Sequence, residues 1–336
     1  MSITAKELAK KLNISAATVS MVLNHKPGIS EETRELVFNE AKKNGYDFSK
    51  LRQPSTGIIY FIIYKKHGNV VGDTPFFAQV IEGLETDCRH AGSRLQILYF
   101  NEMTTAQEQL DVVINSGCCG VILLGTEMMK QDYIPFSKLR IPLVVLDSYY
   151  DELPFWTVLI NNVRGAYLAT CYLIEQGHTE IGYLQSSKSI SNFEERADGF
   201  FKALRSRKLK KNMNFVFRVT PVLEKAYEEF SKILDTSPKL PTCFFADNDL
   251  IALGCYRALK EHGYRIPDDI SIIGFDDIPA CQMVEPPMTT VRVPKQLFGA
   301  YAVRQLLQQL ANPVQEATKV EIATELILRN SVRCIK

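Results

Sequence analysis

Residues 57–64 read Gly-Ile-Ile-Tyr-Phe-Ile-Ile-Tyr and contain no charged side chain. A helix pattern follows over residues 77–91 and ends at Gly92. A strand that is apolar on both faces is typical of a parallel sheet covered by helices on both sides. The segment therefore predicts a βα unit with a buried strand.

The same alternation of short apolar runs and helix patterns continues along the chain. Further strands are predicted at 95–99, 119–124, 143–147, 181–184, 215–219, 243–246 and 271–275. Helices are predicted at 105–115, 163–176, 193–205, 223–234, 249–262 and 295–310. At about 150 residues per domain, a chain of 336 residues has room for two such units and a small appendage. We therefore expect an α/β body with two parallel, doubly wound sheets.

Two segments are interpreted as crossings between the sheets. Residues 147–162 contain Pro154 and have mixed polarity, and Pro286-Pro287 begins a return crossing. These crossings predict one lobe from 57–161 and 290–318 and a second lobe from 162–289 and 319–336. A ligand cleft is expected between the lobes, because ligands of open α/β sheets bind beyond the carboxyl ends of the strands.

The residues that follow the predicted strands are the candidates for this cleft. They are Thr74-Pro75-Phe76-Phe77, Asp147, Asp247-Asn248-Asp249 and Asp276-Asp277, with Arg196 early in a helix. Carboxylates, amides and a guanidinium hydrogen-bond hydroxyl groups, and a Phe ring offers an apolar face, so the set suits a sugar-like ligand. Each acid can instead cap a helix, which is favoured for Asp247 and Asp249, and at least one of the two Phe rings is expected in the core. Asn248 and Asp276 are the stronger site candidates.

Residues 1–48 predict three short helices. The first begins at Ala5 behind a capping box of Thr4 and Glu7. The second follows Ser15, and the third runs from Ser30 to Gly45. One face of the second helix is apolar and holds Val19, Val22 and Leu23. Its other face is small and uncharged and holds Ala16, Ala17, Ser20, Met21 and Asn24.

Two short helices that are joined by a tight turn and packed on a third form the arrangement that enters a DNA major groove. Small side chains let a helix approach base edges, alanine methyl groups can contact thymine methyl groups, and hydroxyl groups can bind phosphate. Residues 1–56 hold nine Lys or Arg and six acids, against 30 and 32 in the remainder, which is compatible with a polyanion at the head. A plain three-helix bundle fits the helix pattern equally well. Residues 49–56 are expected to form a short linker.

Composition and motifs exclude several classes of protein. The apolar fraction of 46% and the charged fraction of 23% are typical of a globular chain, and no apolar run reaches the roughly 18 residues of a membrane span. The first residues carry no secretory signal, so we expect a cytoplasmic protein without a membrane partner. The eight cysteines form no C-x-x-C pair and are expected to be free thiols. No nucleotide-binding, hydrolase or metalloprotease motif occurs, so no catalytic residue, cofactor or metal site is expected.

Several segments, in order along the chain, resemble the LacI/GalR family of bacterial transcription regulators. The head resembles the family in residues 4–9 (TAKELA), 15–24 (SAATVSMVLN) and 29–34 (ISEETR). The body resembles it in residues 74–77 (TPFF), 162–167 (NVRGAY), 177–178 (GH), 195–200 (ERADGF), 248–252 (NDLIA), 266–277 (IPDDISIIGFDD) and 286–291 (PPMTTV). Each segment alone is weak, but the ordered set is specific and covers nearly the whole chain.

The resemblance implies a helix-turn-helix head and a two-lobed effector domain like the type I periplasmic binding proteins. It also implies a homodimer, without catalysis, whose heads bind a pseudo-palindromic operator and whose cleft binds a small effector, often a sugar or sugar phosphate. The positions that match DNA-backbone contacts of the family are Thr4, Ser15, Thr18, Ser20, Asn24, Ser30 and Thr33. The base-reading positions are Ala16, Ala17 and Met21. The effector-contacting positions are Phe76, Asp147, Arg196, Asn248 and Asp276.

Two departures from the family pattern bear on this function. The family commonly has Arg at the third base-reading position, whereas Met21 makes no bidentate contact with guanine, so a different sequence preference is expected. Residues 46–56 lack the Pro-Asn and Ala-Arg signature of the family's hinge helix and are shorter by roughly two helical turns. That hinge normally inserts a Leu into the minor groove. Leu51 is a possible substitute, but a plain linker is the favoured interpretation.

The sequence therefore predicts a DNA-binding regulator, a repressor, whose operator affinity is controlled by a sugar-like effector. The alternative is a small-molecule binding protein that no longer recognises an operator. A solute-binding protein for transport would share the cleft but would lack the head and carry a secretory signal. A cytoplasmic enzyme would use Asp249, Asp276 or Asp277 as acid, base or metal ligand.

Overall fold

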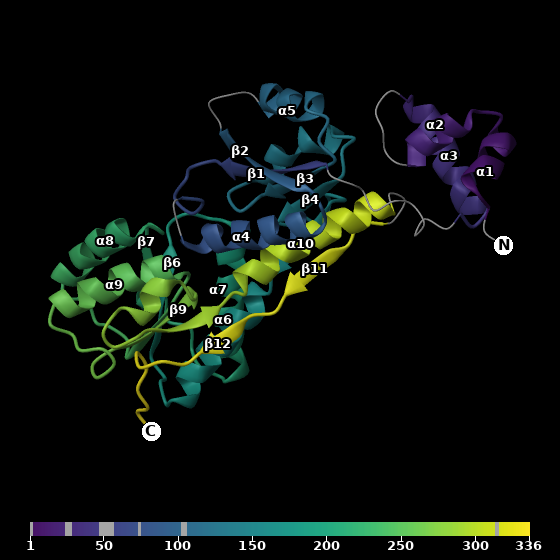
Figure 1. Ribbon diagram of the computed structural model, residues 1–336. Helices are drawn as coiled ribbons and strands as arrows, with labels where there is room; N and C mark the ends of the chain where they lie inside the picture. The colour runs from purple at the N-terminus through teal and green to yellow at the C-terminus, as the bar shows by residue number, and fades with distance from the viewer. Residues whose placement is uncertain (1–2, 24–28, 47–56, 73–74, 102–105, 313–315) are drawn as a thin grey trace.

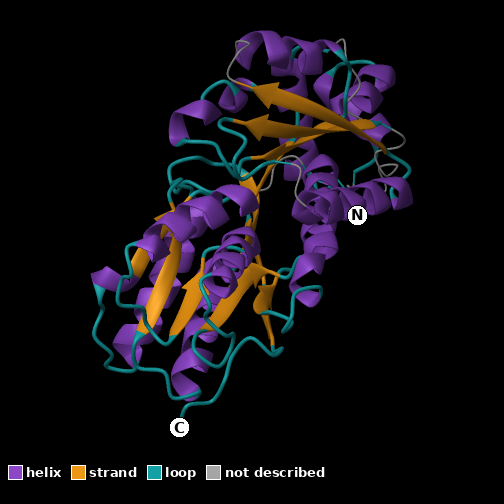
Figure 2. Ribbon diagram, turned by 90° about the vertical axis from the view of Figure 1, so that its left-hand side faces the viewer, coloured by secondary structure: helices purple, strands orange, loops and turns teal. Residues whose placement is uncertain are grey.

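A computed structural model describes residues 3–23, 29–46, 57–72, 75–101, 106–312 and 316–336 of the protein. Figure 1 shows a helical head at the amino terminus and a body in which two α/β lobes are built from interleaved parts of the chain. Figure 2 shows the strands of each lobe enclosed by helices. The predicted α/β class and the three-helix head are confirmed.

The head consists of α1 (Ala5–Leu12), α2 (Ala16–Leu23) and α3 (Glu31–Lys43). The capping box forms as predicted: the Thr4 hydroxyl accepts a hydrogen bond from the Glu7 N–H at 3.3 Å, and the Glu7 carboxylate accepts one from the Thr4 N–H at 2.8 Å. The three helices bury one another through side chains that include Leu8, Val19, Val22 and Val37, all fully buried. Hydrophobic burial therefore holds the head together, and its helix caps fix where the helices begin.

The first lobe is built on a parallel sheet with the strand order β11-β5-β4-β3-β1-β2. Its strands are β1 (Ile58–Lys65), β2 (Arg94–Asn101), β3 (Gly120–Leu124), β4 (Leu143–Leu146), β5 (Trp156–Ile160) and β11 (Lys319–Ile322). Its helices are α4 (Pro75–His90), α5 (Ala106–Asn115) and α10 (Lys295–Ala311).

Strand β1 is buried on both faces, as residues 57–64 predict. Ile59 and Phe61 pack in one cluster with α4 and α10, whereas Tyr60 and Ile62 pack in another with α5. Successive side chains of a strand point to opposite faces, so an unbroken apolar run requires a cover on each side. The continuous hydrophobicity of β1 therefore places the strand inside the sheet.

The second lobe has the strand order β12-β10-β9-β8-β6-β7, and within the described residues only β12 runs antiparallel to its neighbour. Its strands are β6 (Ile181–Ser186), β7 (Val216–Val219), β8 (Cys243–Ala246), β9 (Ser271–Asp276), β10 (Thr289–Arg292) and β12 (Glu325–Ile327). Its helices α6 (Asn162–Glu175) and α7 (Ser191–Ser206) pack on one face, and α8 (Leu223–Asp235) and α9 (Asp249–Glu261) pack on the other.

The crossings between the lobes differ from those expected. Residues 147–162 were expected to cross, but they contain β5, which pairs with β4, so the chain crosses only between β5 and α6. Residues 290–292 belong to the second sheet as part of β10, and 319–322 belong to the first sheet as β11. The lobe boundaries at 289/290 and 318/319 therefore shift. Short strands such as β11, buried at only one residue, carry too weak an apolar pattern to be recognised.

The eight cysteines are free, as predicted, and only Cys334 is exposed. The predicted linker 49–56 and the last two residues of the predicted head domain lie outside the described residues.

Candidate functional site

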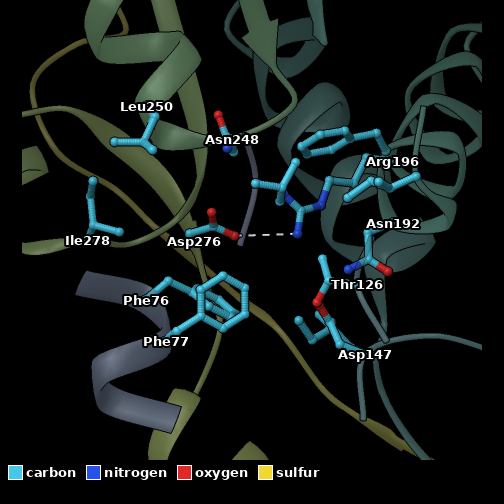
Figure 3. Close-up of a pocket in the computed structure, with 14 residues that line it drawn as sticks. Phe76, Phe77, Thr126, Asp147, Asn192, Arg196, Asn248, Leu250, Asp276 and Ile278 are labelled. Atoms are coloured by element: carbon cyan, nitrogen blue, oxygen red, sulfur yellow. Dashed lines mark hydrogen bonds and ion pairs between the residues drawn. The ribbon is translucent and has the colours of Figure 1, made fainter. Parts of the chain in front are cut away.

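A pocket lies between the two lobes, next to the carboxyl ends of strands from both sheets (Figure 3). It contains about 470 Å³ of empty space, part of which is open to solvent. Its walls are formed by Val70, Phe76, Phe77, Thr126, Asp147 and Ile160 of the first lobe and Ile190, Asn192, Phe193, Arg196, Asn248, Leu250, Asp276 and Ile278 of the second. The structure thus brings together all five positions expected to contact an effector, Phe76, Asp147, Arg196, Asn248 and Asp276.

Arg196 lies at the centre of the second-lobe wall and is almost completely buried. Its Nε donates to Asn162 Oδ1 at 2.9 Å, and its Nη1 donates to the backbone oxygen of Asp247 at 2.6 Å. Its Nη2 forms an ion pair with Asp276 Oδ1 at 3.4 Å, and the guanidinium carbon lies 3.8 Å from the centre of the Phe275 ring. Each edge of the guanidinium is therefore engaged by the protein, which fixes the side chain in place.

Asp147 follows β4 in a left-handed backbone conformation (φ 70°) that points its carboxyl group into the pocket. One oxygen accepts a hydrogen bond from the Thr126 hydroxyl at 2.6 Å. The other oxygen is buried and has no hydrogen-bond partner among the described residues. Burial raises the pKa of Asp147 to about 6, against the opposing effects of Thr126, Asn192 and Arg196. A buried acceptor without a partner is a place for a ligand donor.

Asn248 and Asp276 have different local roles. The Asn248 side chain caps α9 by accepting the Ile251 N–H at 2.9 Å, while it also lines the pocket. Asp276 ends β9 with φ 118°, which is unusual for a residue with a side chain, and it faces Arg196 (Figure 3). Burial raises the pKa of Asp276, while Arg196 and Lys295 oppose this effect. Its positive φ directs its carboxylate toward Arg196.

Asp247 and Asp249 are buried behind the pocket wall and do not line it. Asp247 accepts hydrogen bonds from the Tyr183 hydroxyl and the Ser186 N–H, and Asp249 accepts them from the Thr290 hydroxyl and the Ile278 N–H. Burial raises the pKa of each carboxyl group to about 7. Both therefore act as structural acceptors that join strands and loops, a role different from the helix caps expected of them.

Phe76 and Phe77, at the start of α4, are both buried and both line the pocket. Their rings are 5.0 Å apart at an angle of 76°. The ammonium nitrogen of Lys295 lies 5.7 Å from the centre of the Phe76 ring and donates a hydrogen bond to the backbone oxygen of Asp277 at 3.1 Å. At least one of the two rings was expected in the core. This is confirmed, since both rings belong to the core cluster, and both also line the pocket.

The remaining lining residues were not recognised in the sequence. Thr126 lies two residues beyond β3, so the rule that selected Asp147 also applies to it. Asn192 and Phe193 lie four and three residues before Arg196 on α7, so helical spacing places them on the same face. Val70, Ile160, Ile190, Leu250 and Ile278 carry no signal that separates them from core residues.

Some of the positions expected to contact DNA cap the helices of the head, and others are exposed on α2. Thr4, Ser15 and Ser30 cap the three helices, and the Thr18 and Thr33 hydroxyls lie 2.8 Å from those of Ser15 and Ser30. Ala16, Ala17 and Ser20 are exposed on α2, and Met21 is half-buried. The Asn24 position lies outside the described residues. The structure therefore shows an exposed face on α2 that is small and uncharged.

Two further properties concern the described residues as a whole. None of their helices is long and apolar enough to cross a membrane. They also contain no cluster of three or more His, Cys, Asp or Glu side chains with the geometry to hold a metal ion.

The chain matches two family models. Residues 4–47 match the model of the lacI family of bacterial regulatory proteins, and residues 170–332 match that of a periplasmic binding protein-like domain. Among curated proteins, the HTH-type transcriptional repressor PurR of Pasteurella multocida is 32% identical over 336 residues, which is 98% of each chain.

Solved structures show the same architecture. The transcriptional regulator CelR in complex with cellobiose superposes with a TM-score of 0.73 at 25% identity, over 98% of this chain and 99% of that one. A LacI family transcriptional regulator from Enterococcus faecalis V583 with bound ribose has a TM-score of 0.69 at 28% identity and covers 83% of this chain and 100% of its own. With a DNA-binding head, a two-lobed body and a full-length relative above 30% identity, the chain belongs to the LacI family of bacterial transcriptional regulators.

Proposed function

We propose that this protein is a transcriptional repressor that binds a pseudo-palindromic operator as a homodimer. Its operator affinity is set by a neutral, hydroxyl-rich effector, such as a sugar, bound between the lobes. The observation that carries the effector class is the buried oxygen of Asp147 that has no hydrogen-bond partner among the described residues. The cation of the same pocket, Arg196, is already paired with Asp276. In this role the protein acts in the cytoplasm and releases its effector unchanged.

The charge of the pocket favours a neutral effector. Of the described lining residues, Arg196 is the only cation, and it is paired with Asp276. Asp147 adds a second carboxyl group, whose pKa is raised to about 6 by burial, and no further cation. An anionic ligand such as a sugar phosphate would meet no free positive charge there, whereas the hydroxyl groups of a neutral ligand can donate to Asp147 and to the Asn192 and Asn248 amides.

The apolar walls fit the faces of a sugar ring. Phe76 and Phe77 line the first-lobe side (Figure 3). Phe193 is a lining residue that belongs to the second lobe. The C–H groups of a pyranose or furanose ring form an apolar face that packs against an aromatic ring, while its hydroxyl groups point to the sides. The cellobiose and ribose found in the two structural neighbours belong to this chemical class.

An effector held by both lobes can control the heads because it favours one arrangement of the lobes. Asp147 and the Phe pair belong to the first lobe, whereas Arg196, Asn248 and Asp276 belong to the second. A ligand that bridges them stabilises the arrangement in which all these contacts form. In a dimer, a change in the arrangement of the lobes changes the separation of the two heads. Because the two operator half-sites have a fixed spacing, the dimer then binds the operator with a different affinity.

The exposed face of α2 and the N-termini of the three head helices carry the proposed DNA contacts. We assign base reading to Ala16, Ala17 and Met21, and contacts with the DNA backbone to hydroxyl and amide side chains at Thr4, Ser15, Thr18, Ser20, Asn24, Ser30 and Thr33. None of the base-reading side chains donates or accepts a strong hydrogen bond. The operator half-site is therefore expected to present thymine methyl groups to α2, since these are the apolar feature of the major groove.

The effector class is tested by thermal unfolding of the full chain with cellobiose, ribose and ribose 5-phosphate, followed by calorimetric titration of each compound that raises the melting temperature. We expect stabilisation by a neutral sugar, which is then recovered chemically unchanged. A response to the sugar phosphate alone, or to planar heterocycles alone, would contradict the proposed effector class.

Operator recognition is tested by selecting duplexes from a random pool with the full chain and with residues 57–336. We expect the full chain alone to select a sequence, with an affinity that falls as salt rises. If neither protein selects a sequence but the full chain binds a sugar, the alternative function of a small-molecule binding protein is favoured.

The apolar readout makes a specific prediction for Met21. Replacing the selected half-site thymines by deoxyuridine removes only methyl groups and is expected to weaken binding of the wild type. Met21→Arg is expected to shift selection toward guanine at the facing position, because a bidentate Arg–guanine pair contributes about 1–3 kcal/mol of discrimination. Equal binding of thymine and deoxyuridine duplexes, measured by fluorescence anisotropy, would contradict this readout.

A further inference from the structure

The carboxylate of Glu127 is buried inside a ring of backbone N–H groups next to the pocket. Its Oε2 accepts hydrogen bonds from the N–H groups of Lys66, His67 and Gly68 at 2.9, 2.9 and 2.8 Å. Its Oε1 accepts those of Val70 and Val71, each at 2.9 Å. The Glu127 side chain is fully buried, and these five donors come from one short loop directly after β1.

Successive N–H groups that converge on one point form an anion-binding site. Burial by itself raises the pKa of Glu127, yet the N–H groups of Val71, Gly68, Val70 and His67 outweigh burial and lower it. Glu127 is therefore a buried anion whose charge is balanced by backbone dipoles. The ring Nδ1 of His67 lies 3.1 Å from Glu127 Oε1 and accepts a hydrogen bond from the Asn69 N–H at 3.2 Å. Without the carboxylate, the same five N–H groups would lose their common acceptor.

The loop and Glu127 both adjoin the ligand pocket. Val70 lines the pocket, and Val71 is buried in the core cluster that also holds Phe76 and Phe77. Thr126, which precedes Glu127, lines the pocket and donates a hydrogen bond to Asp147 Oδ2. An ion pair also holds loop 66–71, since Lys66 Nζ lies 2.7 Å from Asp132 Oδ2.

We propose that Glu127 is a positioning residue for effector binding: its carboxylate acts as an internal anion that fixes loop 66–71 and so holds Val70 in the pocket wall. By occupying the anion site of this loop from inside the protein, Glu127 also prevents the phosphate group of a ligand from binding there. This inference rests on the proposed function and adds a reason why the pocket selects neutral ligands.

The first test compares Glu127→Gln with Glu152→Gln. The substituted amide keeps the size of the Glu127 side chain but offers one acceptor oxygen and places an NH₂ group against backbone donors. Glu152 is a matched control because it is an exposed glutamate of the same lobe, paired with Lys130 at 2.8 Å. We expect E127Q to bind the neutral sugar found in the thermal screen at least tenfold more weakly, with E152Q unchanged. Hydrogen exchange of the 66–71 amides is expected to be at least tenfold faster in E127Q only.

The second test restores the anion from solution. Glu127→Ala removes a group with the composition of acetate, so acetate is expected to restore both sugar affinity and amide protection in E127A. Acetamide, which has the same shape without charge, is expected to restore neither. A merely structural role of the Glu127 side chain predicts no difference between acetate and acetamide. If E127A does not fold, the E127Q comparison decides.

The outcomes separate this inference from the proposed function. Wild-type sugar affinity in E127Q, or rescue of E127A by acetamide as well as by acetate, would overturn the role of Glu127. If no neutral sugar binds the wild type, the proposed effector class fails, and amide exchange still tests the loop anchor. Equal exchange of the 66–71 amides in wild type, E127Q and E152Q would then overturn the inference on its own.

Discussion

At the scale of single residues, Arg196 joins parts of the second lobe that are distant in sequence. It connects α7 to the start of α6 through Asn162, to the end of β8 through the Asp247 backbone, and to the end of β9 through Asp276. A planar guanidinium can make these contacts at the same time, whereas a lysine ammonium provides a single point charge. The identity of this residue therefore sets the shape of one pocket wall.

We predict that Arg196→Lys abolishes the effector response and lowers the free energy of unfolding by about 2–4 kcal/mol, because it leaves buried polar groups without partners. Operator affinity without effector is expected to stay within threefold, since the head is unchanged. Arg207→Lys is the control, as Arg207 makes an exposed ion pair with Glu175 at 2.8 Å. Effector titration and urea unfolding check both parts, and wild-type sugar affinity in R196K would contradict the assignment.

The buried carboxyl groups around the pocket predict how stability depends on pH. The pKa of Asp249 is raised to about 7 in the folded protein, so the native state holds a proton that the unfolded chain releases near pH 4. The free energy of unfolding should therefore fall as pH rises from about 4 to about 7 and then level off. Asp247, with a pKa of about 7, and Asp147, with a pKa of about 6, act in the same direction.

We predict that Asp249→Asn flattens this pH dependence by on the order of 3 kcal/mol. An asparagine can accept the Ile278 N–H and donate to the Thr290 hydroxyl, so the hydrogen bonds of Asp249 are kept without its charge. Urea unfolding at several pH values checks the prediction. A variant less stable than the wild type at pH 8, with an unchanged slope between pH 4 and pH 7, would contradict it.

At the scale of elements, glycines set the distance between paired helices. A Cβ atom at Gly299 of α10 would collide with the backbone oxygen of Val80 in α4, and one at Gly83 of α4 would collide with that of Gln296 in α10. Gly199 and Gly254 make equally close contacts at the α6–α7 and α8–α9 pairs. Each pair is therefore held at a separation that any larger residue would increase.

We predict that Gly299→Ala lowers the free energy of unfolding by about 1–3 kcal/mol, although alanine is the better helix former by about 1 kcal/mol. The clash is with backbone atoms, which cannot rotate away as a side chain can. Gln296→Ala, at an exposed position of the same helix, is the control and is expected to have little effect. If urea unfolding shows that G299A is at least as stable as the wild type, then α4 and α10 can move apart without a loss in the free energy of unfolding, which would contradict the prediction.

The elements also show where sequence reasoning succeeds. Long helices and strands buried on both faces, such as β1 and β8, were predicted within about two residues because their apolar patterns are unambiguous. Strand β5 was missed although its five residues are buried, because Pro154 nearby suggested a crossing. Strands β11 and β12 lack an apolar pattern, and pairing with a neighbouring strand defines them. Asp147, Asn248 and Asp276 share the pocket because each follows the end of a strand, whereas Phe76 and Arg196 belong to α4 and α7.

At the scale of the whole molecule, one hydrophobic cluster runs through both lobes. It includes Phe61 and Phe298 of the first lobe and Tyr183 and Phe275 of the second. A shift of one lobe relative to the other would therefore repack shared side chains, and we expect close packing to favour a few distinct arrangements of the lobes over a continuous range. Two arrangements that differ in effector affinity are what coupling to the heads requires.

We predict that coupling between effector and operator is reciprocal. If the saturating neutral sugar changes operator affinity by a given factor, saturating operator must change sugar affinity by the same factor, because the two sites share one coupling free energy. Calorimetric titration of the sugar with and without operator duplex measures one factor, and anisotropy measures the other. Unequal factors would mean that the sugar and the operator are not linked through a single equilibrium.

The three-helix head and the two doubly wound sheets could be predicted from the sequence, because hydrophobic periodicity and helix caps are local properties of the chain. The five effector positions around the cleft were predicted from the resemblance to the LacI/GalR family. The tertiary structure alone decided which strands complete each sheet, since β5, β10, β11 and β12 are placed by pairing with distant segments. It also decided how the charges are arranged: Arg196 is neutralised, one oxygen of Asp147 is left without a partner, and Glu127 is enclosed by backbone N–H groups. Burial and contacts between distant residues set these properties, and no local pattern records them.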